Sequence, residues 1–445
     1  MVVLAKIRVD YSSESNLHGK RIPRARIIDM PKSIQSSIGC TWAWKWLWSG
    51  LALPISKQVC AMLLLVLAAT AAPAPLAWTY TTGNYAWTVA VSSDGRYAIA
   101  GSDDMHVYFF DVKSAQGTPL SSFSTTGYVR DVAISANGTC AAAGDTDGNI
   151  FLFHPLRQAA TPVWRYQSDS AIEALAMSAD GAYLVAGDRR GAIYLFKTEL
   201  NNPLVWDYII PGGIAAISLS KSGSLAVTGT QGGVYFFGSV SSLSGYAWVF
   251  GEHMSFPQIA VSDDTGFVVA GASDGYLYLI DLSGDLMDRE RLGGGVSALS
   301  ISSANRLIVA GSTSGNLSLY STGTGLDRVD SFDVGRPVFS VALSENGQRI
   351  AAADLDGAIL MFGQSFTSLM WTFVTGAMVH SLSMSEDGQV MAAVSDTGGV
   401  YLFDETVTPT GQLPGADMFM PVVSVVGVAM LTVLGYYIMR RRVAE

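Results

Sequence analysis

The chain has 445 residues and a formal net charge of −10, and it contains 46 glycines but only 14% charged residues. This composition favours a β-rich chain, long enough for several small domains or one large repeat domain. The charge is uneven: residues 1–60 carry nine Lys/Arg against three Asp/Glu, residues 76–417 fifteen against thirty-three, and the last six residues three against one. Nucleic-acid binding depends on neutralising phosphates, so a region with a net charge of −18 is a poor candidate for it, and we expect no nucleic-acid partner.

The chain begins with a basic segment, residues 1–58, to which the sequence assigns no fold. Its Trp42, Trp44, Trp46 and Trp48 suit a membrane surface. Residues 59–74 contain an apolar run, VCAMLLLVLAATAA, which follows Lys57 and precedes small residues and prolines. This is the layout of a secretory signal with cleavage near residues 71–74, and an uncleaved signal anchor is the alternative. Because the preceding stretch is long for an n-region, we expect either an internal start at Met30 or a cytoplasmic tail.

A repeat fills residues 75–408. Its most regular marker is a serine, here called the anchor serine, that recurs every 40–43 residues as Ser92, Ser135, Ser178, Ser220, Ser262, Ser302, Ser344 and Ser385. The residue three before it is apolar in every copy. The residue thirteen after it is glycine in seven copies and Met105 in the first. A period near 40 with β-strand patterning is typical of a propeller blade.

Each repeat has the pattern of four short strands. The first ends at the anchor serine, and an Asp-Gly or Asn-Gly turn such as Asp94-Gly95 often follows. A strand of small residues, an aromatic strand and a Trp-x-aromatic strand come next. After the last anchor the Trp-x-aromatic strand is missing, whereas a spare one, residues 78–80, precedes the first anchor. We therefore predict an all-β, eight-bladed β-propeller of four-stranded antiparallel blades, closed by its N-terminal strand. Met105 predicts that the turn between the second and third strands differs in the first blade.

Residues 409–417 form a linker to a predicted transmembrane helix over residues 418–439. Residues 421–439 contain no charge, Tyr436 and Tyr437 lie near one end, and Arg440–Arg442 follow directly. The length suits one membrane span, and positive residues prefer the cytoplasmic side. We expect residues 440–445 to be a basic cytoplasmic tail and the propeller to lie outside the cytoplasm. The protein would then be single-pass at the cell membrane, or double-pass if the N-terminal signal is uncleaved.

Two propeller families resemble the repeat. Phe110-Asp111, Ile280-Asp281 and Phe403-Asp404 resemble weakened versions of the Trp-Asp pair of WD40 repeats. The regular tryptophans, the count of eight and the YSTGTG segment at 320–325 resemble the quinoprotein (PQQ-like) repeat. Enzymatic members of that group bind pyrroloquinoline quinone with calcium and a paired-cysteine element, whereas non-enzymatic relatives are scaffolds. Cys140 is the only cysteine in the propeller region, so that element is absent and we expect no cofactor.

The turns between second and third strands are rich in acids: Asp103, Asp104, Asp145, Asp147, Asp188, Asp274, Asp354, Asp356 and Asp396. These turns share one face with the loops between blades, so we expect an acidic binding face. A calcium site at residues 145–149 or 354–357 is disfavoured, because such a loop is longer and turn chemistry accounts for both acid and glycine. Asp103 and Asp104 lie a strand length from Ser92 and Asp94, so these four groups should not converge.

Other candidate sites are weaker. Arg189-Arg190 is a paired-basic turn that could dock an anion or balance acidic neighbours. His106, His154, His253 and His380 occupy unrelated phases of the repeat, which predicts no common metal site. No catalytic motif is visible. Asn137 and Asn316 begin glycosylation sequons that we expect in exposed turns.

The leading hypothesis is a membrane-anchored, non-enzymatic propeller that presents an acidic face to an extracytoplasmic protein, glycan or cationic ligand. One alternative is an extracytoplasmic enzyme at the propeller axis, quinone-dependent or hydrolytic. Converging carboxylates, Arg and a Trp floor around the axis would favour the enzyme, and a wall of Ala, Ser and Val would argue against it. A second alternative is an accessory subunit of a larger membrane complex.

Overall fold

The computed structural model describes residues 8–15, 21–29 and 72–406, apart from 115, 155–160, 200–202, 224–225, 239–244, 264–265 and 324. Every regular element in these ranges is a β-strand. The predicted signal run before Ala72, the linker and the predicted transmembrane helix lie outside the described residues. Within the ranges given above, no helix is long and apolar enough to cross a membrane. The basic N-terminal segment, to which the sequence assigned no fold, contains an antiparallel hairpin of β1 (Arg8–Ser15) and β2 (Arg21–Asp29).

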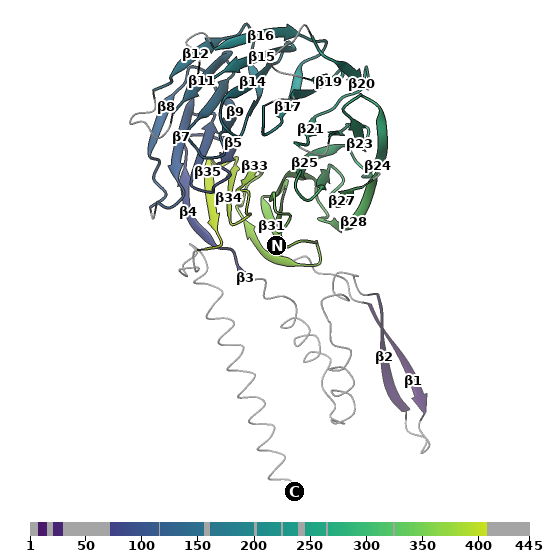
Figure 1. The fold of residues 1–445 in the computed structure, drawn as a ribbon. Helices are drawn as coiled ribbons and strands as arrows, with labels where there is room; N and C mark the ends of the chain where they lie inside the picture. Colours follow the sequence, from purple (N-terminus) through teal and green to yellow (C-terminus); the bar gives the residue numbers. More distant parts are fainter. Residues whose placement is uncertain are drawn as a thin grey trace.

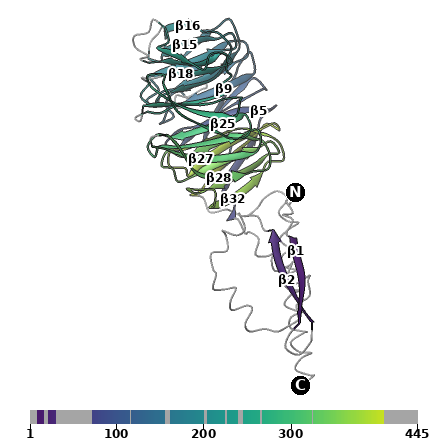
Figure 2. The same ribbon diagram turned by 90° about the vertical axis from the view of Figure 1, so that its right-hand side faces the viewer.

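Eight four-stranded antiparallel sheets form a ring, which Figure 1 shows along its axis and Figure 2 from the side. Blade 1 contains β5 (Ala86–Val91), β6 (Tyr97–Ser102), β7 (His106–Asp111) and β8 (Ser121–Ser124). Blade 2 contains β9 (Val129–Ile134), β10 (Ala141–Asp145), β11 (Asn149–Phe153) and β12 (Trp164–Gln167). Blade 3 contains β13 (Ile172–Met177), β14 (Tyr183–Asp188), β15 (Ala192–Lys197) and β16 (Leu204–Ile209). Blade 4 contains β17 (Ile214–Leu219), β18 (Ala226–Thr230), β19 (Gly233–Phe237) and β20 (Trp248–Phe250). Blade 5 contains β21 (Gln258–Val261), β22 (Phe267–Gly271), β23 (Tyr276–Asp281) and β24 (Leu286–Arg291). Blade 6 contains β25 (Val296–Ser302), β26 (Leu307–Ser312), β27 (Asn316–Thr322) and β28 (Leu326–Asp333).

The last two blades close the ring. Blade 7 contains β29 (Val338–Leu343), β30 (Ile350–Asp354), β31 (Ala358–Phe362) and β32 (Leu369–Val374), with β3 (Ala72–Pro73) added in parallel beside β32. Blade 8 contains β33 (Val379–Met384), β34 (Val390–Ser395), β35 (Gly399–Asp404) and β4 (Leu76–Thr81). Trp78 of β4 pairs with Leu402 of β35. The predicted eight blades and closure by the N-terminal strand are therefore confirmed.

The first strand of each blade packs beside the first strands of both neighbouring blades and forms the inner ring. The position two residues before the anchor serine is Ala or Ser in all eight blades: Ala90, Ala133, Ala176, Ser218, Ala260, Ser300, Ala342 and Ser383. Because neighbouring first strands belong to different sheets, side chains connect them. The hydroxyl of Ser383, for example, accepts a hydrogen bond from the Val91 amide of the next blade at 2.9 Å.

Neighbouring blades fit together through paired small and large residues. A Cβ on Gly144 in the second strand of blade 2 would lie 2.4 Å from Cγ2 of Ile172 in blade 3. Gly101, Gly187, Gly271 and Gly311 face the next blade in the same way. In blade 8 the sizes are exchanged: Val394 takes the glycine position and Ala86 the facing one, both fully buried in one cluster. The small residues predicted for the second strand are thus explained by close packing between sheets.

Aromatic side chains join the blades at larger radius. Trp78 of blade 8 packs on Phe110 of blade 1 with ring centroids 5.1 Å apart, and its indole donates a hydrogen bond to the Val112 carbonyl. Blades without this tryptophan can use aspartate instead. Asp288 and Asp330, at the tryptophan position, accept hydrogen bonds from the amides of Leu326 and Phe366 in the following blades.

One end of the propeller, here called the anchor face, carries the anchor serines. All eight are buried. In blade 1 the Ser92 hydroxyl donates to Asp94 at 2.6 Å and accepts from the Tyr97 amide at 3.0 Å, which confirms its role in the turn. Backbone hydrogen bonds also link turns of adjacent blades, and the bond from the Glu386 amide to the Ser93 carbonyl joins blade 8 to blade 1.

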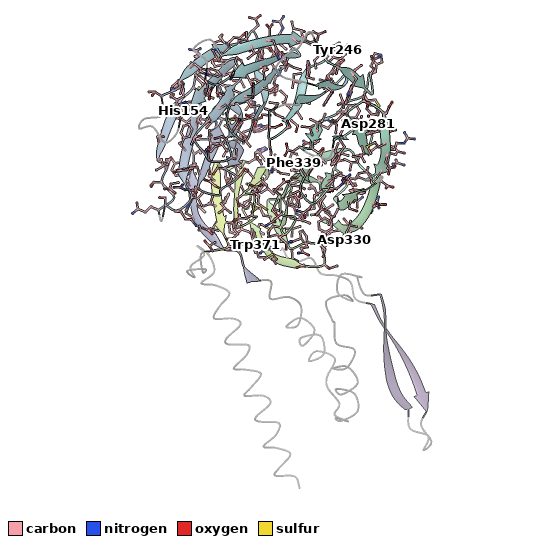
Figure 3. The ribbon with its side chains drawn as sticks, viewed as in Figure 1. His154, Tyr246, Asp281, Asp330, Phe339 and Trp371 are labelled. Atoms are coloured by element: carbon pink, nitrogen blue, oxygen red, sulfur yellow. The ribbon has the colours of Figure 1, made fainter. Side chains whose placement is uncertain are left out.

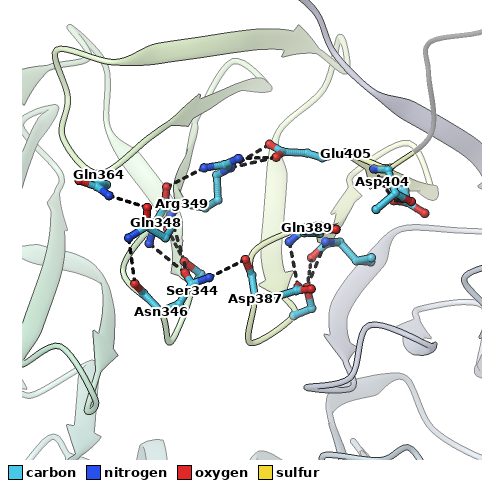
Figure 4. A network of polar contacts seen from close by, with 12 residues as sticks. Ser344, Asn346, Gln348, Arg349, Gln364, Asp387, Gln389, Asp404 and Glu405 are labelled. Atoms are coloured by element: carbon cyan, nitrogen blue, oxygen red, sulfur yellow. Dashed lines mark hydrogen bonds and ion pairs between the residues drawn. The ribbon is translucent and has the colours of Figure 1, made fainter.

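Figure 4 shows the anchor-face contacts of blades 7 and 8. Arg349 makes a bidentate ion pair with Glu405, at 2.8 Å for the shortest contact, and Nδ2 of Asn346 donates to the Asp387 carbonyl. Lys113 of blade 1 reaches the buried Asp404 at the end of β35. These contacts fasten the closing blade to both neighbours.

Candidate functional site on the rim face

The opposite end of the propeller, here called the rim face, carries the loops between blades and the turns between second and third strands. On its inner edge the residue five before the anchor serine changes from blade to blade. It is large in blades 7, 8, 1, 2 and 3, and small or proline in blades 4, 5 and 6: Phe339, His380, Trp87, Arg130 and Glu173, then Ala215, Pro257 and Ser297. Figure 3 shows Phe339 near the axis, well inside Trp371 and Asp330 of the outer strands. The amino-acid sequence alone contains this signal, as variation at one position of an otherwise regular repeat.

Trp87 of blade 1 lies at the centre of the large residues. The guanidinium carbon of Arg130 in blade 2 lies 4.6 Å from the centroid of its ring, and the His380 ring of blade 8 lies 4.2 Å away at 30°. His380 is hydrogen-bonded to Asp396. Since blade 1 stands between blades 8 and 2, the indole is held from two neighbouring blades. A guanidinium over an aromatic ring is a favourable electrostatic contact.

Two polar atoms beside Trp87 are buried without a hydrogen-bond partner among the described residues. They are Oδ1 of Asp103 and Nε of Arg130. The nearest approach of the two side chains, from Arg130 Nη1 to Asp103 Oδ1, is 4.0 Å, which is too long for a hydrogen bond. Burial raises the pKa of Asp103 above its ordinary value, although the charges of Arg130 and His380 act in the opposite direction. Buried polar groups without partners are rare, so these two atoms are candidates to bind polar groups of a ligand.

Large exposed apolar side chains surround this cluster. Those on the rim face include Tyr85, Met105, Tyr128, Phe339 and Leu355, which lie on blades 7, 1 and 2 or on the loops that enter them. Ile209 and Val374 are exposed at the rim ends of the outer strands β16 and β32. In contrast, the loops of blades 4 and 6 contain Gly212-Gly213 and Gly293–Gly295. We refer to Tyr85, Trp87, Met105, Tyr128 and Phe339 as the apolar sector. The two halves of the rim face therefore differ in size and hydrophobicity.

Three of the nine predicted acidic residues do not face solvent. Asp145, Asp188 and Asp354 are 0%, 1% and 5% exposed. Each accepts hydrogen bonds from two backbone amides of its own turn, as Asp145 does from Asp147 and Asn149 at 3.0 and 2.8 Å. The expectation that all nine form a surface is therefore wrong for these three, because an aspartate at the start of the turn folds back onto the turn amides.

The other six acids lie at least partly at the surface, with different partners. Asp104 accepts hydrogen bonds from the Tyr108 hydroxyl and the Gly83 amide, and Asp274 accepts one from the Tyr278 hydroxyl. Asp356 forms an ion pair with Arg336. Asp103 and Asp396 belong to the Trp87 cluster, and Asp147 is exposed. For these residues an acidic binding face remains a prediction.

The turn at Met105 corrects another expectation. Met105 has φ = 63°, in the left-handed region that its seven glycine counterparts also occupy, from 75° at Gly398 to 143° at Gly233. Its amide bonds to the Ser102 carbonyl and its carbonyl accepts from the Thr125 amide, as the Gly148 amide and carbonyl do with Asp145 and Ser168. The first blade therefore does not have a different turn. It keeps the common hydrogen bonds and places a methionine where glycine is favoured.

The remaining candidates are separate from the apolar sector or belong to other blades. Arg189 pairs with Glu173 at 2.6 Å, which supports the charge-balancing interpretation of that basic turn. Asn137 lies in an exposed turn, whereas Asn316 begins β27, is only partly exposed and donates from Nδ2 to the Leu292 carbonyl at 2.6 Å. Across the described parts of the chain, no three His, Cys, Asp or Glu side chains gather in an arrangement that could hold a metal ion.

On the anchor face, a lysine spans the axis. Lys221 of blade 4 lies 3.4 Å from Glu345 of blade 7 and 3.4 Å from Glu386 of blade 8. Burial alone would lower the pKa of Lys221, but the two carboxylates raise it above its ordinary value. Because its partners belong to the far side of the ring, the side chain crosses the axis at this end.

Comparison with known protein families identifies the type of two of the repeats. The model of the WD domain, G-beta repeat, matches residues 78–111 and 117–154. These two repeats are WD-type. Each match begins in or just before the outer strand of one blade and ends at the third strand of the next, so the WD sequence unit is offset from the blade by one strand. The WD40 resemblance is thereby supported, while the quinoprotein-type resemblance stays a prediction.

Solved propellers of low sequence identity share the fold. The Saccharomyces cerevisiae Sqt1 structure is 12% identical with a TM-score of 0.65, and the alignment covers 75% of this chain and 99% of that one. Sqt1 of Chaetomium thermophilum, bound to the N-terminus of the ribosomal protein L10, is 16% identical with a TM-score of 0.63 over 74% and 100%. A computationally designed protein, Ika8, is 19% identical with a TM-score of 0.64 over 75% and 100%. No curated protein sequence matches significantly.

Proposed function

We propose that this WD-type propeller is a non-enzymatic binding module that holds a partner protein on its rim face, over the apolar sector. One observation carries the proposal: the position five before the anchor serine holds large side chains in five consecutive blades and small residues or proline in the other three. The positions three and two before the anchor, in contrast, are apolar and Ala or Ser, respectively, in all eight blades. Residues that vary on a rigid scaffold are where binding specificity is usually found.

The inner ring gives a mixed answer to the choice between binding and catalysis. The position two before the anchor is Ala or Ser in every blade, whereas Trp87, Arg130 and the carboxylates of Asp103 and Asp396 meet at the rim end of the ring. One observation from a related fold favours binding. One Sqt1 structure holds the N-terminus of a ribosomal protein, so a propeller of this shape can bind a peptide segment. For the present chain, a protein partner agrees with the exposed apolar side chains better than a small cationic ligand does.

The experiment is site-specific photocrosslinking in cells, with the full-length chain carrying a photoreactive amino acid at position 339, 128 or 209. Phe339 and Tyr128 lie in the apolar sector, whereas Ile209, which is 70% exposed, lies outside that sector at the rim end of the outer strand β16. We expect the same partner protein to crosslink from 339 and 128 but not from 209. Crosslinks mainly from 209, or from neither 339 nor 128, would contradict the proposal.

We also propose that residues 418–439 attach the propeller to the cell membrane and that residues 59–74, as a cleaved signal or as an uncleaved second anchor, direct it out of the cytoplasm. The two segments agree in orientation, and the described ends of the propeller, Ala72 and Thr406, lie on or directly after adjacent blades 7 and 8. Protease added to intact cells should digest the propeller, and full protection would contradict this orientation. If the protein is instead a subunit of a larger complex, detergent extraction and size analysis should recover it with fixed partner chains.

A further inference from the structure

Met105 combines backbone strain with exposure. It is in the left-handed region at φ = 63°, where the other seven blades have glycine, and its residue exposure is 40%. A side chain is disfavoured in this region because its Cβ crowds the following carbonyl oxygen. An exposed side chain gains little from packing within the propeller, so the fold itself gives no reason for methionine at this position.

The turn of Met105 lies between the two tyrosine-bearing loops of the rim face. The Asp103 amide donates to the Tyr85 carbonyl at 2.9 Å, and the Thr125 amide donates to the Met105 carbonyl at 2.8 Å. The loop that starts at Thr125 continues to Tyr128, which is 43% exposed. Met105 is therefore fixed among exposed tyrosines by the same hydrogen bonds that the glycine turns make.

We infer that Met105 is a contact residue of the rim face and that its strained conformation is retained because its side chain binds an apolar side chain of a partner peptide. Strained residues concentrate at functional sites, and a flexible thioether adapts well to an apolar partner. The inference rests on the proposed function and specifies the chemistry of the partner at the same site.

The charges around Met105 indicate that the peptide is basic. Asp103 has an oxygen without a hydrogen-bond partner, Asp147 is exposed, and Asp396 is about one-third exposed. Among the arginines of this face, Arg189 pairs with Glu173 and Arg336 with Asp356, whereas Arg130 is 4.0 Å from Asp103 and has a buried Nε without a partner. With residues 76–417 at fifteen Lys/Arg against thirty-three Asp/Glu, long-range attraction also selects a positive partner. The expected ligand is a peptide with an apolar anchor flanked by Lys or Arg.

A glycan is the less suitable occupant. Sugar binding commonly uses the open face of an aromatic ring, but Arg130 and His380 pack against Trp87 from its two neighbouring blades. Of the other four members of the sector, Met105 and Phe339 have no polar side-chain group to bond sugar hydroxyls, and only Tyr85 and Tyr128 carry a hydroxyl.

The test compares the full-length chain with Met105→Gly, Met105→Leu and, as a matched control, Arg306→Gly. Arg306 is also left-handed, at φ = 53°, but lies on the anchor face. The probes are labelled synthetic 12-residue peptide pools: one with a central Leu, Phe or Met between Lys/Arg residues, one with Asp/Glu flanks, and one with Lys/Arg flanks around Ser. Affinity is measured by fluorescence polarisation and stability by the midpoint of thermal unfolding.

We expect Met105→Gly to raise the unfolding midpoint by about 1–3 °C and to weaken binding of the basic apolar pool about tenfold. Met105→Leu should keep affinity within about threefold, because it restores an apolar side chain of similar volume. Arg306→Gly should leave affinity unchanged. The acidic pool and the serine pool should bind at least about tenfold more weakly than the basic apolar pool.

Several results would overturn the inference. If Met105→Gly binds like wild type, or if it lowers the unfolding midpoint, Met105 is not a strained contact residue. Preference for acidic peptides, or Met105-dependent binding to a glycan array instead, would show that the partner chemistry is wrong. If Phe339→Ser weakens binding of the basic apolar pool while Met105→Gly does not, only the inference fails and the proposed function stands. If the pool does not bind wild type, the inference fails and crosslinking alone decides the proposed function.

Discussion

The anchor face and the rim face are two ends of the same eight blades, yet residues repeat from blade to blade on the first and vary from blade to blade on the second. On the anchor face the serine is present in every blade and is buried in every blade. On the rim face the position only five residues earlier changes from Trp to Ala and from Arg to Ser. Equivalent positions can therefore be compared between the eight blades of one chain. Positions that hold the same residue type maintain the blades, and positions that differ on a common backbone are free to recognise a partner.

The largest expected effect comes from breaking a contact that all blades need. Gly144→Val would place its Cβ 2.4 Å from Ile172 Cγ2, so blades 2 and 3 must separate. We expect a loss of about 3 kcal/mol or more in the free energy of unfolding, measured by urea denaturation. Adding Ile172→Ala should recover at least half of it, because Val394 and Ala86 already form the exchanged pair in blade 8. No recovery in the double variant would show that the size pairing is not what joins the blades.

An anchor serine should have the next largest effect. Ser178 donates to Asp180 at 2.6 Å and accepts from the Tyr183 amide at 2.9 Å while fully buried. Ser178→Ala leaves both partners without this bond and should destabilise the chain by about 1–3 kcal/mol. Ser122→Ala, at an exposed position of β8, serves as the control and should change stability by less than about 0.5 kcal/mol. Equal effects of the two substitutions would contradict the structural role of the anchor.

A smaller effect should appear as pH dependence in the inner ring. Burial raises the pKa of Asp131 to about 6, although it accepts hydrogen bonds from the Leu175 and Val132 amides and the Thr88 hydroxyl. Because the folded pKa exceeds the unfolded value of about 3.9, the folded chain holds a proton that the unfolded chain has lost between these values. The contribution of Asp131 to stability therefore falls as the pH rises toward and through 6.

The measurement is the difference in unfolding free energy between wild type and Asp131→Asn at pH 5.0 and at pH 7.5. Asn has no titrating proton, so the difference isolates this one carboxyl from the other acids. We expect wild type to lose about 1 kcal/mol relative to the variant between the two pH values. A constant difference would show that the pKa of Asp131 is not raised.

The smallest effect on stability should come from the rim face. Phe339 is 40% exposed, so Phe339→Ser should change the free energy of unfolding by less than about 0.5 kcal/mol while it removes the partner that crosslinks from this face. Ile209→Ser on β16 is the matched control for loss of an exposed apolar side chain. A large loss of stability from Phe339→Ser would mean that the rim positions also maintain the blades, and the contrast between the two faces would disappear.

The fold could be predicted closely because its signals repeat. Eight serines in phase, the Asp-Gly turns and the displaced Trp78–Tyr80 strand each appear in the printed sequence and led to the right number of blades and the right closure. The site could not be predicted equally well, because individual side chains choose their partners in three dimensions. Asp145 resembles Asp147 in the sequence, yet one is buried in its turn and the other is exposed.

One wrong prediction and one missed cluster have physical reasons that sequence spacing does not contain. The first blade keeps its turn in spite of Met105, since the surrounding hydrogen bonds hold a conformation that a methionine alone disfavours. The clustering of Arg130, His380 and Trp87 also depends on three blades meeting at one edge, so residues 43 and 293 positions from Trp87 become its neighbours. All three residues stand five positions before an anchor serine, so their unusual size is visible when the eight repeats are aligned.

The joint between β4 and β35 has a mechanical consequence. The two strands are antiparallel, so Leu76 at the start of β4 pairs with Phe403 near the end of β35, and both connecting segments leave the propeller from the same end of this pair. A force that pulled these two segments apart would break the β4–β35 hydrogen bonds one after another. A force that pulled both segments in the same direction would not separate the two strands. Two tethers in a common membrane would therefore leave the ring closed under tension, and a single tether under load would pull on the joint between β4 and β35.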